Sequence, residues 1–361
     1  MKNSREIMPE LVSSNNFVNC EISSLHLDSR DVKEGSVFFA IKGTNLNGID
    51  FIEEARSKGA KLIISEELID DKSIVHCDNL NELLGKFASR FYSYASKELT
   101  TFCATGTNGK TTSVETYANI CKRLGKQCGY ISTIGKSING RVVDELSHLT
   151  TPDPISLNQS FSEMSMNGAT HAAFEASSHG LDQGRLLEIS IDYAVLTSFS
   201  QDHLDYHKSI EEYGNAKRIL FKELQPKHSF IQIDSEFGLS LYEDLVRNKA
   251  EVFSVSLEKK SDFSALFNKT DDSLDVYLKS PYGETEFNLR TVSRYIASNV
   301  ICSIAALSVE GIKIDKLVER ASEISFPAGR LESMRVGKDI CYVDYAHTPE
   351  ALKHTLKEIR E

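Results

Sequence analysis

The sequence lacks the features that mark membrane-inserted and secreted proteins. Its most apolar stretch, residues 295–309, is too short to cross a bilayer and contains four polar residues, Ser298, Asn299, Ser303 and Ser308. The first ten residues, MKNSREIMPE, have no apolar core of the kind found in signal peptides. No internal repeat or low-complexity linker is visible. We therefore expect a cytoplasmic protein with no membrane insertion.

Paired cysteines and an excess of basic charge are also missing. The seven cysteines include no C-x-x-C pair, which argues against a zinc site or a redox dithiol and suits a reducing compartment. Lys and Arg total 41 against 52 Asp and Glu, so the formal net charge is −11. An acidic surface repels phosphate backbones, so we expect no nucleic-acid partner. A local phosphate site is still compatible with this charge, because a glycine-rich loop and a helix terminus can hold phosphate.

The composition and the order of segments are those of a globular α/β protein. The 361 residues are 40% apolar and 26% charged, and the length suggests two domains with room for part of a third. Strand-like and helix-like segments alternate, which predicts α/β architecture with a mainly parallel sheet. Helices are predicted at residues 51–58 and 295–309, and a β-hairpin at 275–289. Strands are predicted at residues 36–41, 61–65, 101–105, 128–132, 171–174, 193–197, 229–233 and 252–255.

Two changes of character divide the chain into three parts. An amphipathic run over residues 80–96 ends before a boundary near Glu98, and a second boundary lies near residues 326–330. We expect an N-terminal α/β domain over residues 1–98 and a central nucleotide-binding domain over residues 99–327. Residues 328–361 contain one predicted strand and one predicted helix, which cannot make an independent domain. They are therefore predicted to begin a further, Rossmann-like domain that is incomplete in this chain.

A phosphate-binding loop follows the predicted strand at residues 101–105. Residues 104–111 read ATGTNGKT, with Ala104 in place of the first glycine of the P-loop pattern. Gly106 and Gly109 let backbone N–H groups approach a polyphosphate, Lys110 can reach the outer phosphates, and the Thr111 hydroxyl can ligate Mg²⁺. A strand before the loop and a helix after it favour this interpretation over a chance glycine-containing turn. The motif predicts nucleotide binding and leaves the reaction open.

Polar groups follow the next two predicted strands. Glu175 ends the strand at residues 171–174, and Asp202 and His203 come after the strand at residues 193–197. Because the carboxyl ends of strands in open α/β sheets face the ligand crevice, Glu175 is a candidate metal ligand and His203 could ligate a metal or orient a ligand. A solvated glutamate and a structural histidine are the alternatives.

Lys217 is predicted to point inward from a helix. Ser209 and Glu212 have capping-box spacing, so a helix begins there. Lys217 lies on the apolar stripe of that helix, which is formed by Ile210, Tyr213, Leu220, Phe221 and Leu224. An unpaired ammonium in such a place is costly, so Lys217 must pair in a salt bridge, reach solvent or be chemically altered.

With these residues identified, the sequence closely resembles the Mur ligases, and among them those that join a diamino acid to UDP-N-acetylmuramoyl-L-alanyl-D-glutamate. The phosphate loop and the Gly-Arg-x-Glu segment at residues 329–332 are shared by related ligases. The segments TTPD (150–153), SSHGL (177–181) and DHLDYH (202–207) are typical of this member. Further matching segments are LDSR (27–30), Ala216-Lys217 and VDYAHTP (343–349).

The resemblance implies an ATP-dependent amide ligase of peptidoglycan synthesis, and thereby a part in cell-wall biogenesis, cell shape and cell division. ATP would phosphorylate the D-glutamyl carboxylate of the precursor, and the amine of meso-diaminopimelate or L-lysine would attack the acyl phosphate to give the amide and phosphate. The implied cofactors are ATP and Mg²⁺. The protein would contribute to catalysis mainly by positioning the reactants and by neutralising charge on the transferred phosphoryl group. We expect a monomer.

The resemblance also assigns site residues by matching position. Catalytic roles go to Lys110, Lys217, Glu175 and His203. The implied Mg²⁺ ligands are Thr111, Glu175, His203 and Lys217, the last carried as a carbamate. The implied ATP-binding residues are Gly106, Thr107, Asn108, Gly109, Lys110, Thr111, Thr112, Asn299, Arg330, Asp344 and His347. The uridine diphosphate end would be held by Leu27, Ser29, Thr44, Asn45 and Leu46, and the muramoyl-peptide end by Thr150, Thr151, Ser177, Gln183 and Arg185.

The sequence departs from the family pattern in two places. Residues 293–296 read SRYI where the family has Gly-x-Phe-Asn, although Asn299 is kept, so no adenine contact is implied for this segment. Most of the family's C-terminal domain has no counterpart after Glu361, so we expect this chain to bind the nucleotide-sugar but to turn over poorly or not at all. The alternatives are a nucleotide-binding fragment without ligase activity and another Mur or folylpolyglutamate-type ligase. The segments at residues 150–153 and 177–181 argue against the latter.

Overall fold

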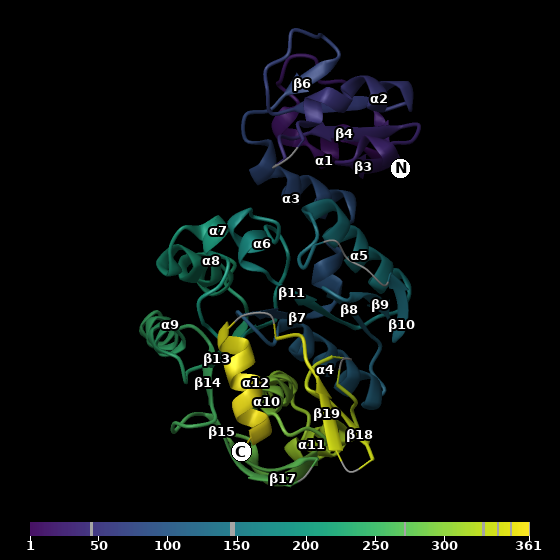
Figure 1. Cartoon of the computed structure of the whole chain (residues 1–361). Coiled ribbons are helices and arrows are strands. Elements are labelled where there is room, and N and C mark those ends of the chain that lie inside the picture. The colour runs from purple at the N-terminus through teal and green to yellow at the C-terminus, as the bar shows by residue number, and fades with distance from the viewer. Residues whose placement is uncertain are drawn as a thin grey trace. The chain divides into compact units, whose positions relative to one another are not determined.

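The computed structural model describes residues 1–43, 46–144, 149–270, 272–326, 329–337, 339–346 and 349–360. The chain separates into two compact units (Figure 1). The first unit contains Met1–Lys97, Pro152–Ser162 and Gln183–Ile189. The second unit contains Glu98–Thr151, Glu163–Asp182 and Ser190–Glu361.

The first unit is built on a parallel sheet with strand order β3-β4-β5-β6. Its strands are β3 (Ser24–His26), β4 (Ser36–Ala40), β5 (Leu62–Ser65) and β6 (Ile74–His76). Val37 and Phe39 of β4 pack in one apolar cluster, while Phe38 and Ala40 pack in another, because successive side chains point to opposite faces of a strand. Both faces are therefore covered, which is the normal state of a parallel sheet.

Short helices complete this unit. The cluster with Val37 also contains residues of α1 (Ser4–Ile7) and α3 (Leu80–Phe91), and the cluster with Phe38 contains residues of α2 (Ile52–Ser57). The predicted amphipathic run over residues 80–96 is shorter as a helix, because Ser93 and Tyr94 adopt left-handed backbone angles (φ 55° and 57°). The remaining elements are β1 (Lys2–Asn3), β2 (Glu21–Ile22) and the 3₁₀ turns Pro9–Leu11, Ser29–Asp31, Gly48–Phe51 and Ala95–Glu98.

Among the described residues of the second unit, eleven strands form one sheet, in the order β10-β9-β8-β11-β7-β12-β13-β14-β15-β16-β17. The strands from β8 to β15 in this order pair in parallel, and antiparallel hairpins flank them at both edges, so the predicted α/β fold with a mainly parallel sheet is confirmed. The strands are β7 (Thr100–Thr105), β8 (Cys128–Ser132), β9 (Gly135–Ile138), β10 (Arg141–Asp144), β11 (His171–Glu175), β12 (Tyr193–Leu196), β13 (His228–Gln232), β14 (Val252–Ser256), β15 (Phe263–Lys269), β16 (Leu274–Ser280) and β17 (Gly283–Leu289).

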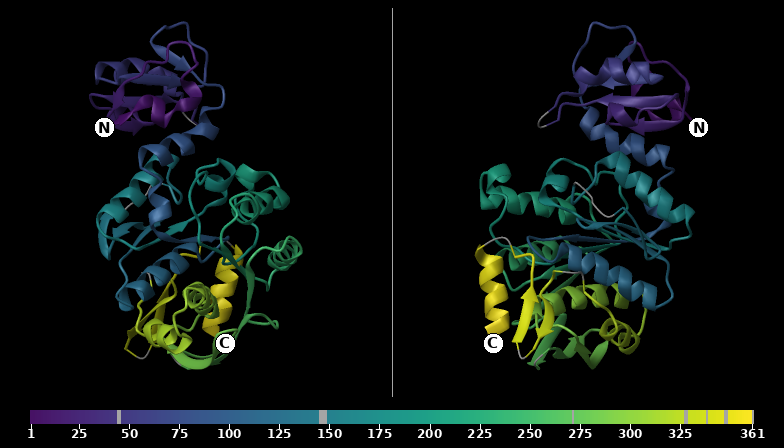
Figure 2. Two further views of the ribbon diagram at one scale, coloured as in Figure 1. Left: turned by 180° about the vertical axis from the view of Figure 1, so that it is seen from behind. Right: turned by 45° about the vertical axis from the view of Figure 1, so that its right-hand side comes forward.

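Helices cover both faces of this sheet (Figure 2). On one face α4 (Lys110–Arg123), α10 (Arg294–Val309) and α11 (Ile314–Ser322) share the largest apolar cluster with the strands. Every residue of α10 from Ile296 to Ser308 is buried, and Ser303 and Ser308 satisfy their hydroxyls by donating to carbonyls one turn earlier. The remaining helices of this unit are α6 (Ser178–Asp182), α7 (Leu204–His207), α8 (Ile210–Lys222) and α9 (Glu236–Arg247). The helix α5 (Pro154–Met166) belongs to both units, because its residues up to Ser162 count with the first.

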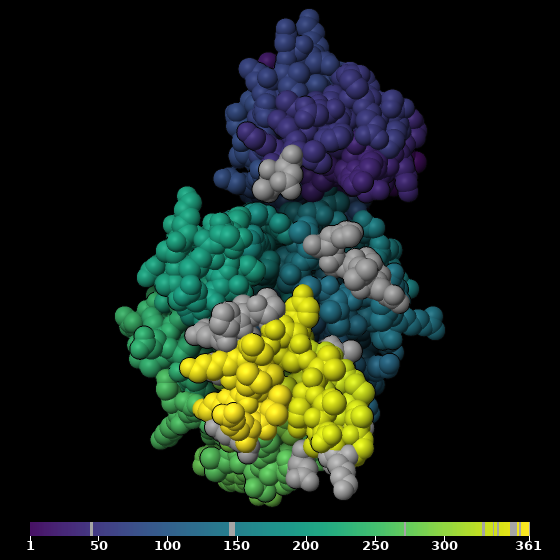
Figure 3. Space-filling view, viewed as in Figure 1, coloured from purple at the N-terminus to yellow at the C-terminus, as the bar shows by residue number. Residues whose placement is uncertain are grey.

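The last described residues form a hairpin and a helix on the surface of the second unit (Figure 3). β18 (Glu332–Val336) pairs antiparallel with β19 (Asp339–Val343), and α12 (Pro349–Arg360) follows. Ile359 of α12 packs against a small apolar cluster formed by Val292, Ile296 and Leu331. The strand and helix predicted here are confirmed, whereas β18 was not predicted.

Most predicted elements are confirmed to within two residues at each end. The predictions omitted the short strands β3, β6, β9 and β10, the strand β15, and the helices α5, α9 and α11 among others. One position of the predicted stripe on α8 is wrong: Ile210 is 40% exposed, because it is the first helical residue and lies beside the N-cap Ser209. Among the described residues, no helix is long and apolar enough to cross a bilayer.

Leu278 and Leu266, on the paired strands β16 and β15, give a test of where the core lies. Leu278 is 0% exposed and Leu266 is 72% exposed. We expect Leu278→Ala to lower the free energy of unfolding of the second unit by about 2–5 kcal/mol, because it removes buried methyl groups and leaves a cavity. Leu266→Ala should change it by less than about 0.5 kcal/mol. Urea denaturation followed by fluorescence measures both, and equal effects would contradict the assigned faces.

Candidate nucleotide and metal site

The phosphate-binding loop is shaped by two glycines that no other residue could replace without movement. Gly106 (φ 149°) and Gly109 (φ 90°) have left-handed backbone angles. A Cβ at Gly106 would lie 2.1 Å from Thr197 Oγ1, and one at Gly109 would lie 2.7 Å from Asn299 Oδ1. Ala104 needs no such freedom, because it is a buried residue of β7 paired on both sides with neighbouring strands.

The residues after β12 hold this loop in place. Thr107 N donates to Ser198 O (3.1 Å), and Asn108 N donates to Ser198 Oγ (2.9 Å). The Thr197 hydroxyl is within hydrogen-bonding distance of Asn108 O (2.5 Å) and Thr105 O (3.0 Å). The loop conformation is therefore fixed by protein contacts, so its free N–H groups are organised for an anion at the N-terminus of α4.

Lys110 folds back onto the loop. Its Nζ donates to Gly106 O (2.9 Å) and Thr107 O (3.1 Å). Burial lowers the pKa of Lys110, and the nearby carboxylates of Glu175 and Asp202 oppose that shift. The ammonium thus lies at the loop that a polyphosphate would occupy, held by carbonyl oxygens that a phosphate could replace.

Glu175 is buried at the carboxyl end of β11, so the solvated-glutamate alternative is wrong. Thr111 Oγ1 donates to Glu175 Oε1 (2.9 Å), and Thr133 N donates to the same oxygen (2.9 Å). Burial raises the pKa of Glu175, whereas the charge of Lys110 and these hydrogen bonds lower it. The predicted pair of Thr111 and Glu175 is in direct contact, and Thr133 is a partner that sequence reasoning missed.

His203 follows β12 with a left-handed backbone angle (φ 51°) and lies in a cluster of rings. Its ring meets that of His179 edge-on at 5.0 Å, and His179 in turn contacts Tyr206 and His207. Burial lowers the pKa of His203, and the carboxylate of Asp202 opposes that shift. The neutral imidazole is the form that ligates a metal.

Lys217 points inward as predicted and is 1% exposed. Its Nζ lies 4.4 Å from the centroid of the Tyr213 ring, and no salt bridge with a carboxylate forms among the described residues, so the salt-bridge alternative is wrong. Burial is the largest cause that lowers the pKa of Lys217 well below its ordinary value, and the charge of Lys110 adds to it. The environment therefore favours a neutral, nucleophilic amine.

Electrostatic interactions connect these groups. The charge of Lys110 acts on Glu175, His203 and Lys217, which come from three different elements. Within the described part of the chain, no three His, Cys, Asp or Glu side chains form a group that could hold a metal. The predicted metal ligands include only two such side chains, with Thr111 and Lys217 making up the set.

A cavity of about 370 Å³ adjoins the phosphate loop. Asn108, Gly109 and Thr112 line it from the loop and α4, and Asn299 from α10. Arg330 and Asp344, both predicted ATP-binding residues, line it from the last part of the chain. The predicted residues Gly106, Thr107, Lys110 and Thr111 are not among those that line it, and His347 lies outside the described residues.

Asp344 and Arg330 have partners of their own. Asp344 accepts hydrogen bonds from Leu331 N (2.8 Å) and Ala346 N (2.9 Å), so it organises the chain on both sides of β18 and β19. The Arg330 guanidinium lies over the Tyr345 ring at 5.0 Å. The segment that departs from the family pattern also reaches this cavity, through Ser293, Tyr295 and Ile296.

The predicted muramoyl-peptide residues fall into two groups. Thr151 and Ser177 are in the second unit, where their hydroxyl oxygens lie 3.0 Å apart and the Thr151 hydroxyl donates to Glu175 O (2.9 Å). The Thr150 hydroxyl accepts from Thr133 Oγ1 (3.4 Å). Gln183 and Arg185 belong to the first unit and are bonded to each other through Arg185 Nη2 and Gln183 Oε1 (2.6 Å).

The predicted uridine diphosphate residues share a cavity of about 590 Å³ in the first unit. Leu27, Ser29 and Leu46 line it, together with Phe39 and Glu54 among others. The buried Ser29 hydroxyl donates to Glu54 Oε2 (2.5 Å), a partner that lies 25 residues away and gave no sequence signal. Two predicted residues, Thr44 and Asn45, lie outside the described residues.

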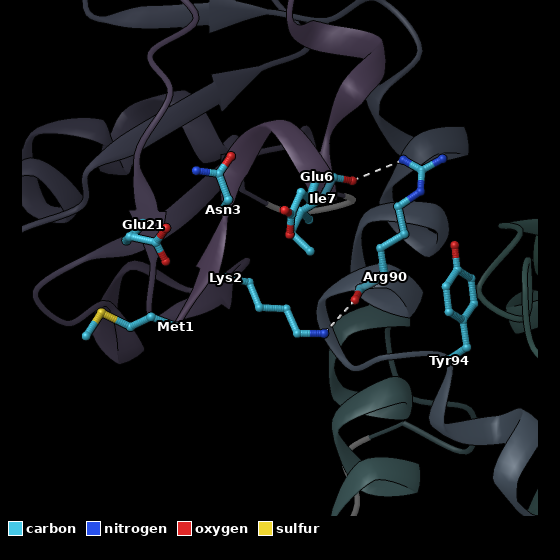
Figure 4. Close-up of a pocket in the computed structure, with 8 residues that line it drawn as sticks. All are labelled: Met1, Lys2, Asn3, Glu6, Ile7, Glu21, Arg90 and Tyr94. Carbon is cyan, nitrogen blue, oxygen red and sulfur yellow. Dashed lines mark hydrogen bonds between the residues drawn. The ribbon is translucent and has the colours of Figure 1, made fainter.

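Another hollow in the first unit, of about 550 Å³, contains none of the predicted residues (Figure 4). Its cationic side chains, Lys2 and Arg90, are already bound. Lys2 Nζ donates to Arg90 O (2.9 Å), and Arg90 Nη1 donates to Ile7 O (3.0 Å). This hollow therefore offers little free positive charge to an anionic ligand.

Glu115 is a buried carboxyl that sequence reasoning missed. It lies on α4, five residues after Lys110, and is 7% exposed. Its Oε1 has no hydrogen-bond partner among the described residues. Burial first, and then the negative charge of Glu175, raise the pKa of Glu115 to about 7.

Comparison with known proteins identifies the family to which these features belong. The model described as "Mur ligase middle domain" matches residues 104–307, and "Mur ligase family, catalytic domain" matches residues 21–92. The chain is 33% identical over 356 residues to the UDP-N-acetylmuramoyl-L-alanyl-D-glutamate–2,6-diaminopimelate ligase of Pseudomonas putida, covering 94% of this chain and 71% of that protein. The corresponding ligase of Bacillus cereus is 34% identical over 352 residues, with 95% and 71% covered.

Solved structures agree with this match. A UDP-N-acetylmuramoyl-L-alanyl-D-glutamate–2,6-diaminopimelate ligase superposes with a TM-score of 0.85 at 27% identity, covering 100% of this chain and 74% of its own. The MurF ligase of Thermotoga maritima in complex with ADP superposes with a TM-score of 0.69 at 20% identity, covering 93% and 74%. The second likeness concerns the fold alone.

The pKa of Glu115 makes stability depend on pH. Its folded pKa of about 7 lies above the ordinary value of 4.5, so the protonated form is favoured in the folded chain. As pH rises above 4.5 the carboxyl ionises in the unfolded chain but stays protonated in the folded one, which stabilises the unfolded state. The free energy of unfolding therefore falls between about pH 4.5 and about pH 7, by roughly 3 kcal/mol in all. We expect Glu115→Gln to flatten this part of the pH profile, measured by urea denaturation between pH 4.5 and 8. The exposed control Glu251→Gln should keep the wild-type slope; an unchanged slope in Glu115→Gln would contradict the assignment.

Proposed function

Because the chain belongs to the Mur ligase family, we propose that it joins a diamino acid to UDP-N-acetylmuramoyl-L-alanyl-D-glutamate in an ATP-dependent reaction. The amino acid is meso-diaminopimelate or L-lysine, and the names of the relatives favour diaminopimelate. The observation that carries the proposal is the arrangement at the phosphate loop, where Lys110 acts electrostatically on a buried carboxylate and a buried amine, Glu175 and Lys217. Such a site suits phosphoryl transfer to a carboxylate.

The chemistry has two steps. An oxygen of the D-glutamyl carboxylate attacks the γ-phosphorus of ATP, the bond to the bridging oxygen breaks, and ADP leaves an acyl phosphate behind. The lone pair of the incoming amine then attacks the acyl carbon, and the tetrahedral intermediate expels phosphate while the nitrogen loses a proton to solvent. Lys110 and the N–H groups of the loop stabilise the charge on the transferred phosphoryl group in the first step.

We assign the Mg²⁺ ligands to Thr111, Glu175, His203 and Lys217. The donors would fit a hard cation, because three of the four would be oxygens once the buried Lys217 amine adds CO₂, loses a proton and becomes an anionic carbamate. When bound, Mg²⁺ would neutralise charge between the ATP phosphates. The environment of Lys217 supports this assignment. The amine is buried and forms no salt bridge with a carboxylate among the described residues, and burying an unpaired ammonium would cost free energy.

The remaining residues would bind the substrates. The ATP residues are Gly106, Thr107, Asn108, Gly109, Lys110, Thr111, Thr112, Asn299, Arg330, Asp344 and His347. The nucleotide end of the precursor would be bound by Leu27, Ser29, Thr44, Asn45 and Leu46, and its muramoyl-peptide end by Thr150, Thr151, Ser177, Gln183 and Arg185. We place the reaction in the cytoplasm, in peptidoglycan synthesis for cell-wall growth and division, and expect a monomeric protein.

Gly106→Ala tests whether the loop binds ATP. The added Cβ would lie 2.1 Å from Thr197 Oγ1 in a left-handed conformation, so the loop must rearrange. We expect the affinity for Mg²⁺ and a non-hydrolysable ATP analogue to fall by about 10- to 100-fold, measured by calorimetry. Gly168→Ala is the matched control, because Gly168 also has a left-handed angle (φ 79°) but open space around it. Equal affinities in the two variants would contradict nucleotide binding at this loop.

Lys217→Ala tests the ligase proposal. We expect the variant to bind UDP-N-acetylmuramoyl-L-alanyl-D-glutamate in calorimetry as the wild-type chain does, because the nucleotide-sugar residues are elsewhere. In a complete enzyme that releases phosphate with ATP, Mg²⁺ and diaminopimelate, Lys217→Ala should abolish that release, and added bicarbonate should not restore it. Undiminished phosphate release would remove Lys217 from the site. A wild-type chain that binds both nucleotides without phosphate release would instead be a nucleotide-binding module.

A further inference from the structure

Tyr213 is a buried aromatic residue that none of the assigned roles uses. It lies on α8, one turn before Lys217, and is 1% exposed. The rings of Phe199 (5.4 Å between centroids) and His207 (5.5 Å) pack against it. These contacts leave the Tyr213 ring little freedom to move, so its two ends are held in fixed places.

Each end of Tyr213 contacts a different part of the candidate site. Its hydroxyl lies 3.0 Å from Thr107 Oγ1, in the phosphate loop. Thr107 Oγ1 donates to Ser200 O (3.0 Å), so its proton is used there and the Tyr213 hydroxyl is the donor to Thr107. The face of the ring lies beneath Lys217 Nζ, at 4.4 Å.

We propose that Tyr213 is a positioning residue that fixes the distance between the phosphate loop and the Lys217 side chain. The hydroxyl fixes Thr107, and the ring fixes the Lys217 side chain, so one rigid group sets the spacing between the two. The meaning of this spacing for catalysis rests on the ligase function proposed above. The contacts themselves do not depend on that function.

The two ends of Tyr213 have separable effects. A buried phenol that loses its hydroxyl leaves Thr107 Oγ1 with one hydrogen bond fewer and loosens the loop, while the ring stays under Lys217. Loss of the ring removes the rigid surface against which the Lys217 side chain packs, so that side chain gains freedom to move. Tyr213→Phe should therefore affect the loop alone, and Tyr213→Leu should affect both the loop and Lys217.

Tyr117→Phe is the matched control. Tyr117 is also buried in the second unit, on the helix that follows the loop. Its hydroxyl is buried with no hydrogen-bond partner among the described residues. Removing that hydroxyl takes away the same atom from a similar environment without breaking a contact to the loop.

The experiment measures the loop and Lys217 separately, in the ligand-free chain. Hydrogen–deuterium exchange with mass spectrometry follows the peptide that covers residues 105–112. We expect exchange about fivefold faster in Tyr213→Phe and Tyr213→Leu, as for the loss of one hydrogen bond, and unchanged in Tyr117→Phe. A ¹³C NMR spectrum in ¹³C-bicarbonate follows the Lys217 carbamate, with Lys217→Ala identifying its signal; the signal should persist in Tyr213→Phe and fall several-fold in Tyr213→Leu.

Each outcome decides a part of the proposal. Loop exchange in Tyr213→Phe that matches Tyr117→Phe would overturn the role of the hydroxyl. A carbamate signal of full intensity in Tyr213→Leu, or none in the wild-type chain, would overturn the role of the ring. Failure of the ligase function is seen separately, as an absence of phosphate release in a chain whose loop exchange still responds to Tyr213→Phe.

Discussion

Ionisable side chains are held away from water at the carboxyl edge of the central strands of the second unit. Glu175 ends β11, Lys217 lies on α8, and Glu115 lies on α4, and all three are buried. Each such group is costly unless its neighbours compensate it. Compensation here is incomplete, because burial is the largest influence on the pKa of all three groups. The surrounding packing must therefore supply the stability that keeps them in place.

The strand order explains how these groups meet. β7, which leads into the phosphate loop, lies between β11 and β12, so the segments that follow all three strands reach one edge of the sheet. Thr197 and Ser198, which follow β12, form hydrogen bonds with the phosphate loop. Glu175, at the end of β11, accepts a hydrogen bond from Thr111. Charge neutralisation and loop shape thus depend on the same few strand ends. A phosphate that enters this edge meets donors that are already in place.

Local patterns predicted the parts of this site that a single segment determines. The glycines of the loop, the carboxylate at the end of β11 and the inward direction of Lys217 all follow from spacing within one element. Contacts between distant segments could not be predicted in this way. The bond from Tyr213 to Thr107, the burial of Glu115 and the membership of Gln183 and Arg185 in the first unit depend on how separate elements pack. Ile210 shows the limit of a local pattern. The helical spacing correctly places it on the same side as Tyr213, but it is the first helical residue, where the buried face of α8 has not yet begun.

The start of α10 shows what the departure from the family pattern does in this chain. Ile296 is buried in a small apolar cluster with Val292 and Leu331, and Ile359 of α12 packs against it. A polar side chain at this position would be removed from water among apolar neighbours. Ile296 therefore serves packing, while Glu358 of α12 accepts a hydrogen bond from Arg294 N (2.6 Å) in the first turn of α10. The polar side chains of this helix start that line the adjoining cavity are Ser293, Tyr295, Ser298 and Asn299, and of these the buried Ser298 hydroxyl has no partner among the described residues.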